Sequence, residues 1–99
     1  LLHLLLAAWC VAAEPPIALR NVTVVDPARG AVEEGQTVLI RGGRISALGK
    51  QVRLPGGVRE IDAAGKFLIP GLWDAHVHLA LGTEAAFPAL LANGVTSVR

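Results

Sequence analysis

The sequence has 99 residues, of which 53% are hydrophobic and 17% are charged, with a net charge of +1. This composition is typical of a globular protein and excludes a disordered chain. It also excludes a basic surface for nucleic acid or anionic lipid, because the cationic residues are dispersed and only 4% of the residues are aromatic.

The first thirteen residues, LLHLLLAAWCVAA, are apolar apart from His3. A helix of this length spans about 20 Å, which is too short for the ~30 Å hydrocarbon core of a membrane. Small residues at 11–13, followed by Glu14-Pro15-Pro16, favour a signal peptide over residues 1–13 whose basic n-region is missing. A buried core helix is the weaker interpretation. We therefore expect an exported protein, periplasmic or secreted, without a membrane anchor.

Cys10 lies within this leader and is the single cysteine of the chain. Trp9 stands where a lipoprotein signal has a small residue, which argues against lipidation, and a disulfide has no second partner. Any metal bound by the mature chain would therefore have nitrogen and oxygen ligands. The absence of methionine, and an end within the β-branched run 95–99, lead us to expect a piece of a longer chain.

Residues 17–66 read as strands joined by tight turns, without a convincing helix. The strands are expected at residues 17–25, 36–40, 44–49 and 58–62. The turns are expected at residues 26–30, 42–43, 54–57 and 63–66. Gly42-Gly43 fits a two-residue hairpin turn that tolerates positive φ at both positions. Arg41 and Arg44 beside this turn are most simply solvated charges.

The pattern changes after residue 66. Residues 67–69 are a short β-rich run, and residues 71–79, GLWDAHVHL, read as a buried strand that runs into a loop. A helix follows, since apolar residues recur at 87, 90 and 91, and Asn93-Gly94 ends it. Residues 95–98 resume as a strand. A strand, a helix and a strand in about 30 residues form a βαβ unit with parallel strands.

The start of this helix is less defined. Thr83 is the expected N-cap, with Glu84 in the first turn, where a negative charge meets the helix dipole. Thr83 and Glu84 could instead face a substrate, but capping explains them as well and is preferred. Pro88 requires that the helix either kinks there or begins later, with Pro88 at its first position.

His76 and His78 are the candidate metal ligands. On a strand, Asp74, His76 and His78 lie on one face. Two imidazoles on one face can bind a single ion at Zn–N distances of about 2.0 to 2.1 Å if the strand end is slightly bent. Asp74 could accept a hydrogen bond from a neighbouring ring nitrogen or lie near the metal's water. His-x-His alone is a weak signal, and two unrelated polar residues at a strand end are the alternative.

Three stretches carry a family resemblance. KFLIPGLWDAHVHL, at residues 66–79, resembles the metal-dependent amidohydrolase superfamily, whose first barrel strand carries Pro-Gly, a hydrophobic pair and then Asp-x-His-x-His. LLANGVTSVR, at residues 90–99, resembles the entry to the second strand in the branch of imidazolonepropionase and exported prolidase-like enzymes. VLIRGGRISALG and IDAAGKFLIPG resemble the β-rich segment before the barrel. The resemblance covers residues 17–99.

The resemblance implies an α/β fold, a (β/α)8 TIM-type barrel with a small β-sandwich domain. Residues 17–66 would form the N-terminal part of the sandwich, and residues 67–99 the start of the barrel with its first β-α-β unit. Such barrels need about 250 residues. His76 and His78 would bind a divalent ion, with zinc expected, in a site of one or two ions. The ion would lower the pKa of a bound water towards about 7 and polarise the scissile carbonyl.

We therefore expect a metal-dependent hydrolase acting on amide, cyclic amide or dipeptide C–N bonds of a small-molecule or peptide-like substrate. Its catalytic residues are expected beyond Arg99, so the 99 residues alone should be inactive. A non-catalytic binding or assembly protein of the same fold is one alternative, and a small secreted β-module without metal is another. The oligomeric state is open.

Overall fold

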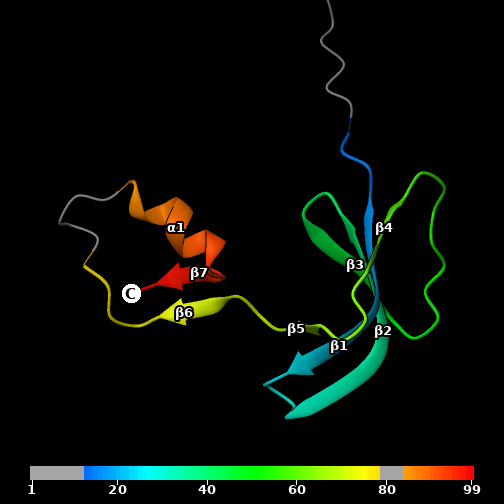
Figure 1. The fold of residues 1–99 in the computed structure, drawn as a ribbon, viewed down its shortest axis with the longest axis horizontal. Coiled ribbons are helices and arrows are strands. Elements are labelled where there is room, and N and C mark those ends of the chain that lie inside the picture. Colours follow the sequence, from blue (N-terminus) through cyan, green and yellow to red (C-terminus); the bar gives the residue numbers. More distant parts are fainter. Residues whose placement is uncertain (1–12, 79–83) are drawn as a thin grey trace, which may run out of the picture.

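A computed structural model of the protein describes residues 13–78 and 84–99. Its elements are β1 (Ile17–Asp26), β2 (Ala31–Arg41), β3 (Arg44–Gly49), β4 (Arg59–Asp62), β5 (Phe67–Leu68), β6 (Leu72–Asp74), α1 (Ala86–Ala92) and β7 (Val95–Val98). They form a larger sheet with the order β3-β2-β1-β4, in which β5 also pairs with β1, and a β6-β7 sheet (Figure 1). Residues 1–12 of the expected leader lie outside the described residues. No helix within the described part is both long and apolar enough for a membrane span.

β1 is hydrogen-bonded along both edges. β2 pairs with one edge in antiparallel orientation, from Ile17 opposite Ile40 to Asp26 opposite Ala31. β4 and then β5 pair with the other edge, both parallel to β1. Backbone hydrogen bonds bridge the short interval between them, from Ala63 N–H to the Arg20 carbonyl at 2.8 Å and from Thr23 N–H to the Lys66 carbonyl at 3.0 Å. The predicted strand at 17–25 is therefore confirmed, and the structure places it in the interior of the sheet.

The predicted hairpin at Gly42-Gly43 is confirmed. The two glycines have φ values of 53° and 71°, and Arg41 pairs with Arg44 across the turn. β2 is longer than predicted, because it begins at Ala31 and not at residue 36. Glu33, Glu34 and Gly35 interrupt any apolar pattern before residue 36, but the pairing of Ala31 and Val32 with β1 continues to the preceding turn.

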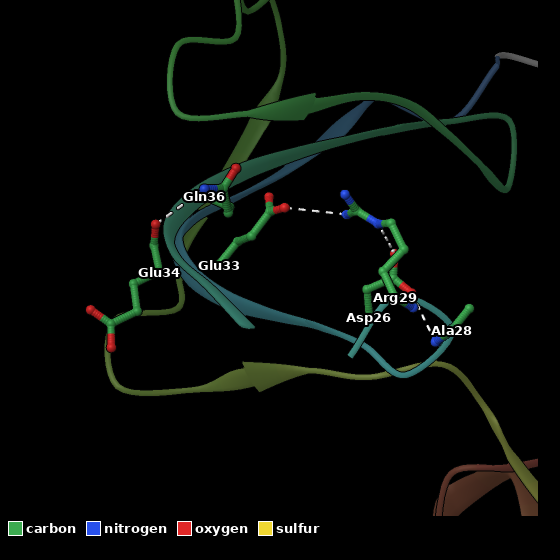
Figure 2. A network of polar contacts seen from close by, with 6 residues as sticks. All are labelled: Asp26, Ala28, Arg29, Glu33, Glu34 and Gln36. Carbon is green, nitrogen blue, oxygen red and sulfur yellow. Dashed lines mark hydrogen bonds and ion pairs between the residues drawn. The ribbon is translucent and has the colours of Figure 1, made fainter. Parts of the chain in front are cut away.

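The turn between β1 and β2 is held by side-chain hydrogen bonds (Figure 2). Asp26 Oδ1 accepts the backbone N–H groups of Ala28 and Arg29 at 3.0 and 3.2 Å. The Arg29 guanidinium donates to Asp26 Oδ2 at 2.6 Å and to Glu33 Oε1 at 3.2 Å. The hydrogen bond from the Arg29 side chain is the main cause that lowers the pKa of Asp26 below its ordinary value. The turn is therefore tied to the start of β2.

The core of the larger sheet is small. It consists of Val22, Val38 and Ala63, and four partly buried side chains pack against it: Leu19, Val24, Ile40 and Leu68. Several large apolar side chains lie outside this core and are exposed in the structure, including Ile45, Phe67 and Ile69. The hydrophobic face of the sheet is therefore only partly covered by the described residues.

β6, α1 and β7 form the predicted βαβ unit, since β6 and β7 are parallel and α1 connects them (Figure 1). The strand that was expected to carry His76 and His78 before running into a loop is shorter than predicted, because β6 ends at Asp74. The Asp74 carboxylate accepts the backbone N–H of His76 at 3.0 Å, and this local bond bends the chain away from extended structure. The strand was also expected to be buried, but Leu72 and Trp73 are 46% and 72% exposed. Among the described residues, β6 pairs with β7 alone.

The predicted start of the helix is wrong. α1 begins at Ala86 after Ala85 as N-cap, without a side-chain cap and without an acidic residue in its first turn, so Glu84 precedes the helix. Thr83 lies outside the described residues. Pro88 is the third residue of the helix. A backbone N–H at this position would have no partner within the helix, so the lack of one in proline breaks no helical hydrogen bond. The predicted end is confirmed, with Asn93 as C-cap and Gly94 at φ 80°.

Asn21 allows a test of the packing between β1 and β4. It has a φ of 60°, and its side-chain amide donates to Asp62 Oδ1 at 3.0 Å. This bond, and then the one from the Ala64 N–H, lowers the pKa of Asp62 below its ordinary value of 3.8. A carboxylate with a lowered pKa stabilises the fold at pH values above its unfolded pKa. That contribution is lost as the pH falls through the lower folded value.

Asn21→Ala and Asn21→Gly should therefore raise the pKa of Asp62 to the same extent, as measured by NMR titration of its carboxyl carbon. Their free energies of unfolding should differ, because glycine adopts a positive φ freely whereas alanine costs about 1 to 2 kcal/mol there. Urea unfolding at pH 7 measures this difference. Equal stability of the two variants would contradict the assigned backbone conformation.

Candidate metal centre

The two ends of β6 are fixed to the chain around β7. The Leu72 N–H donates to the Gly94 carbonyl at 2.8 Å, and the Arg99 N–H donates to the Asp74 carbonyl at 3.0 Å. Asp74 is thus held by its backbone, while its side chain holds the His76 N–H. These contacts place the histidine loop at the C-terminal end of a parallel strand, where active sites of α/β proteins gather.

The structure brings His76 and His78 together. Their Nε2 atoms are 3.2 Å apart, and their ring centroids are 5.1 Å apart with an interplanar angle of 64°. Both rings are exposed. The convergence that the spacing predicted is present, but it arises from the bend after Asp74 and not from alternation along a strand.

The distance between the ring nitrogens fits a shared metal ion. Two nitrogen ligands at about 2.0 to 2.1 Å from a tetrahedral zinc ion lie about 3.3 to 3.4 Å apart. The observed 3.2 Å is close to this separation. Ligation by both Nε2 atoms requires the ring protons to be on Nδ1. Without a metal, one Nε2 must donate to the other, which requires different tautomers in the two rings.

The Asp74 carboxylate makes a backbone contact that the sequence did not predict. The sequence left two roles open for Asp74, accepting from a histidine ring nitrogen or lying near the water of a metal, whereas in the structure its Oδ1 accepts from the backbone N–H of His76. The carboxylate therefore orients the loop that carries the first histidine. Within residues 13–78 and 84–99, no group of three or more potential metal ligands is present. The hydrogen bond from the Arg99 N–H to the Asp74 carbonyl could not be predicted from the sequence, because it depends on the register between β6 and β7.

Comparison with known proteins relates the chain to hydrolases. It is 40% identical over 93 residues to a dihydroorotase of Geobacter metallireducens, and the match covers 83% of this chain and 21% of that enzyme. It is 36% identical over 89 residues to an adenine deaminase of Listeria monocytogenes, covering 87% and 15% of the two chains. A deacetylase of Agrobacterium fabrum is 40% identical over 67 residues, covering 67% of this chain and 16% of that protein. No protein-family model matches the chain.

Solved structures agree with these relatives. A prolidase-like protein of Bifidobacterium longum has a TM-score of 0.75 and 31% identity, covering 88% of this chain and 23% of that structure. A prolidase in complex with N-methylphosphonate-L-proline has a TM-score of 0.67 and 31% identity, covering 85% and 25%. The chain belongs to the amidohydrolase superfamily.

The resemblance seen in the sequence is thus confirmed at the level of the superfamily. These amidohydrolases include enzymes that act on amide and other C–N bonds. The chain spans about a fifth of the length of the curated dihydroorotases that it matches.

The role of the Asp74 carboxylate can be tested with Asp74→Ala and Asp74→Asn. Alanine removes the acceptor, and a hydrogen bond of this kind contributes about 0.5 to 1.5 kcal/mol. The His76 amide should therefore exchange with solvent about 2- to 10-fold faster in Asp74→Ala. Asp74→Asn keeps an oxygen acceptor and should retain slow exchange. Amide exchange followed by NMR measures both, and equal rates in Asp74→Ala and the unchanged protein would refute the assignment.

Proposed function

We propose that the chain carries part of the metal site of a hydrolase that cleaves amide, cyclic amide or dipeptide C–N bonds. The observation that carries this proposal is the 3.2 Å separation of the two histidine Nε2 atoms at the end of β6. His76 and His78 would hold a divalent ion, with zinc expected from the nitrogen ligands. Asp74 orients the loop that presents them.

When bound, such an ion supplies a water of lowered pKa and polarises the carbonyl of the substrate. His76 and His78 would keep their Nε2 lone pairs towards the ion, with their protons on Nδ1. A catalytic zinc has three protein ligands in known enzymes. The other ligands and the proton-transferring aspartate are therefore proposed to come from the parts of a barrel that follow Arg99.

The proposed architecture is a (β/α)8 barrel that begins within residues 67–99, preceded by part of a β-sandwich at residues 17–66. The parallel β6-α1-β7 unit supports the first assignment, and the five-stranded sheet supports the second. About 250 residues are needed for such a barrel. Supporting this, each of the relatives that match the chain is several times longer.

The substrate class is proposed from the relatives. The matched proteins include a dihydroorotase, an adenine deaminase and prolidases. The activities in these names all act on C–N bonds of small molecules or peptide-like compounds. We propose a substrate of the same class for this protein, attacked by water at the carbon of the C–N bond.

Histidine substitution tests the metal site in the complete protein. His76→Ala and His78→Ala should each lower the bound zinc measured by plasma mass spectrometry. They should also lower kcat/KM for hydrolysis of a panel of cyclic amides and dipeptides. A metal ion contributes several kcal/mol to such reactions, so the loss should be about 10³-fold or more.

Ala75→Ser is the matched control, because it changes the same loop and leaves both histidine rings in place. Unchanged zinc content in both histidine variants would disprove the site. Normal zinc binding without hydrolysis of any amide would instead support a non-catalytic binding protein.

We also propose export, from the apolar leader at residues 1–13. Expression with a complete leader in a bacterial host should give a periplasmic protein whose first residue is Glu14, because the small residues at 11–13 fit signal peptidase. N-terminal sequencing measures this. Replacing Ala13 with Phe should retain the uncleaved precursor, whereas a cytoplasmic, uncleaved protein with the unchanged sequence would contradict the proposal.

A further inference from the structure

Gly71, directly before β6, is close to the side chain of Thr96 in β7. A Cβ built on Gly71 would lie 2.8 Å from Thr96 Cβ and 2.6 Å from Thr96 Cγ2, and it would also overlap Thr96 Oγ1. Gly71 is not among the glycines with positive φ. A contact with Thr96, and not an unusual backbone conformation, therefore excludes a side chain at position 71.

Rotation of the Thr96 side chain cannot remove this overlap. Changing χ1 moves Oγ1 and Cγ2, but Cβ is bonded directly to the backbone and keeps its place. Separations below 3.0 Å are essentially never seen between real Cβ atoms and their neighbours. An alanine at position 71 would therefore force the backbones of β6 and β7 to move relative to each other.

Thr96 is also the point at which the register of the two strands shifts. Leu72 pairs with Val95, whereas Trp73 pairs with Ser97, so β7 has one extra residue between the two pairs. A bulge of this kind bends a strand and changes the direction of nearby side chains. Gly71 provides the space that the bulged Thr96 occupies.

The shifted register leads directly to the histidines. β6 has only three residues, a length of about 10 Å. At its far end, the Asp74 carbonyl accepts the Arg99 N–H at 3.0 Å, and the Asp74 carboxylate accepts the His76 N–H at 3.0 Å. A displacement at Gly71 would change the first of these contacts, which joins the two strands, and would therefore move the loop in which His76 approaches His78.

We infer that Gly71 and Thr96 are positioning residues for the metal site. Their contact sets the β6–β7 register, and the register fixes the loop in which the two Nε2 atoms converge. This inference rests on the proposed function, because it assigns the contact a role in metal binding.

The test adds a Cβ at position 71 and then removes the Cβ at position 96, both in the complete protein. Gly71→Ala should weaken the binding of Co²⁺ about 10- to 100-fold, the range found when groups that orient metal ligands are removed, and should alter the Co²⁺ absorption spectrum. The exchange variant Gly71→Ala/Thr96→Gly should regain most of the affinity and the original spectrum. Gly71→Ala/Thr96→Ala should regain less, because alanine keeps the Cβ of residue 96.

Gly56→Ala is the matched control. A Cβ at Gly56 has no neighbour within 4 Å, and Gly56 is not among the glycines with positive φ. This variant should bind Co²⁺ like the unchanged protein. If Gly71→Ala alone does not fold, the comparison of the two double variants still decides the question, since the inference requires tighter binding by the exchange variant.

Three results would overturn the inference. One is unchanged Co²⁺ affinity and spectrum in Gly71→Ala while His76→Ala loses both, a result that leaves the proposed function intact. Another is failure of Thr96→Gly to restore binding. If Co²⁺ binding of the unchanged protein does not depend on His76, the proposed function is refuted, and the positioning role is then tested by NMR without metal. The third result belongs to that case: ¹⁵N signals of both histidine rings that Gly71→Ala leaves unmoved would overturn the positioning role.

Discussion

β1 needs hydrogen-bond partners along both of its edges, and the course of the chain up to β6 follows from this requirement. β2 satisfies one edge by returning antiparallel. The other edge is satisfied in two stages by β4 and β5, which both run parallel to β1. The chain therefore leaves the larger sheet from β5 in the direction of β1, and this brings it to β6 (Figure 1). The position of the histidine loop therefore depends on how the strands pair with β1.

Much of the larger sheet could be predicted because its signals are local. Two consecutive glycines at 42–43 predict a tight hairpin, and the observed φ values are both positive. The start of β2 could not be predicted, since Glu33, Glu34 and Gly35 carry no strand pattern and Gly35 has a positive φ of 64°. Only the pairing of β1 with residues 31–33 shows that the strand begins earlier. The positive φ of Asn21 had no local signal either. Its amide is held by Asp62, which is distant in the sequence.

For the candidate site, the sequence indicated the correct pair of side chains with an incorrect local structure. The His-x-His spacing led us to place both histidines on a strand before the loop, where alternation would put both rings on one face. In the structure, a hydrogen bond from the His76 N–H to the Asp74 carboxylate ends the strand, and the bend brings the two Nε2 atoms together. Aspartate competes for backbone hydrogen bonds in this way at strand ends as well as in turns.

The convergence of the histidines also depends on information that no local pattern contains. Pro70-Gly71 reads as a turn dipeptide, for which glycine usually provides backbone freedom. Here the glycine instead leaves room for Thr96, a residue that follows α1 in the sequence. The chemical groups of the site can therefore be recognised from a short motif, whereas the position of the loop that carries them depends on the register of two strands that a helix connects. A relative that keeps both histidines but has a larger residue at the position of Gly71 would need a smaller one at the position of Thr96 to hold the same pair of nitrogens.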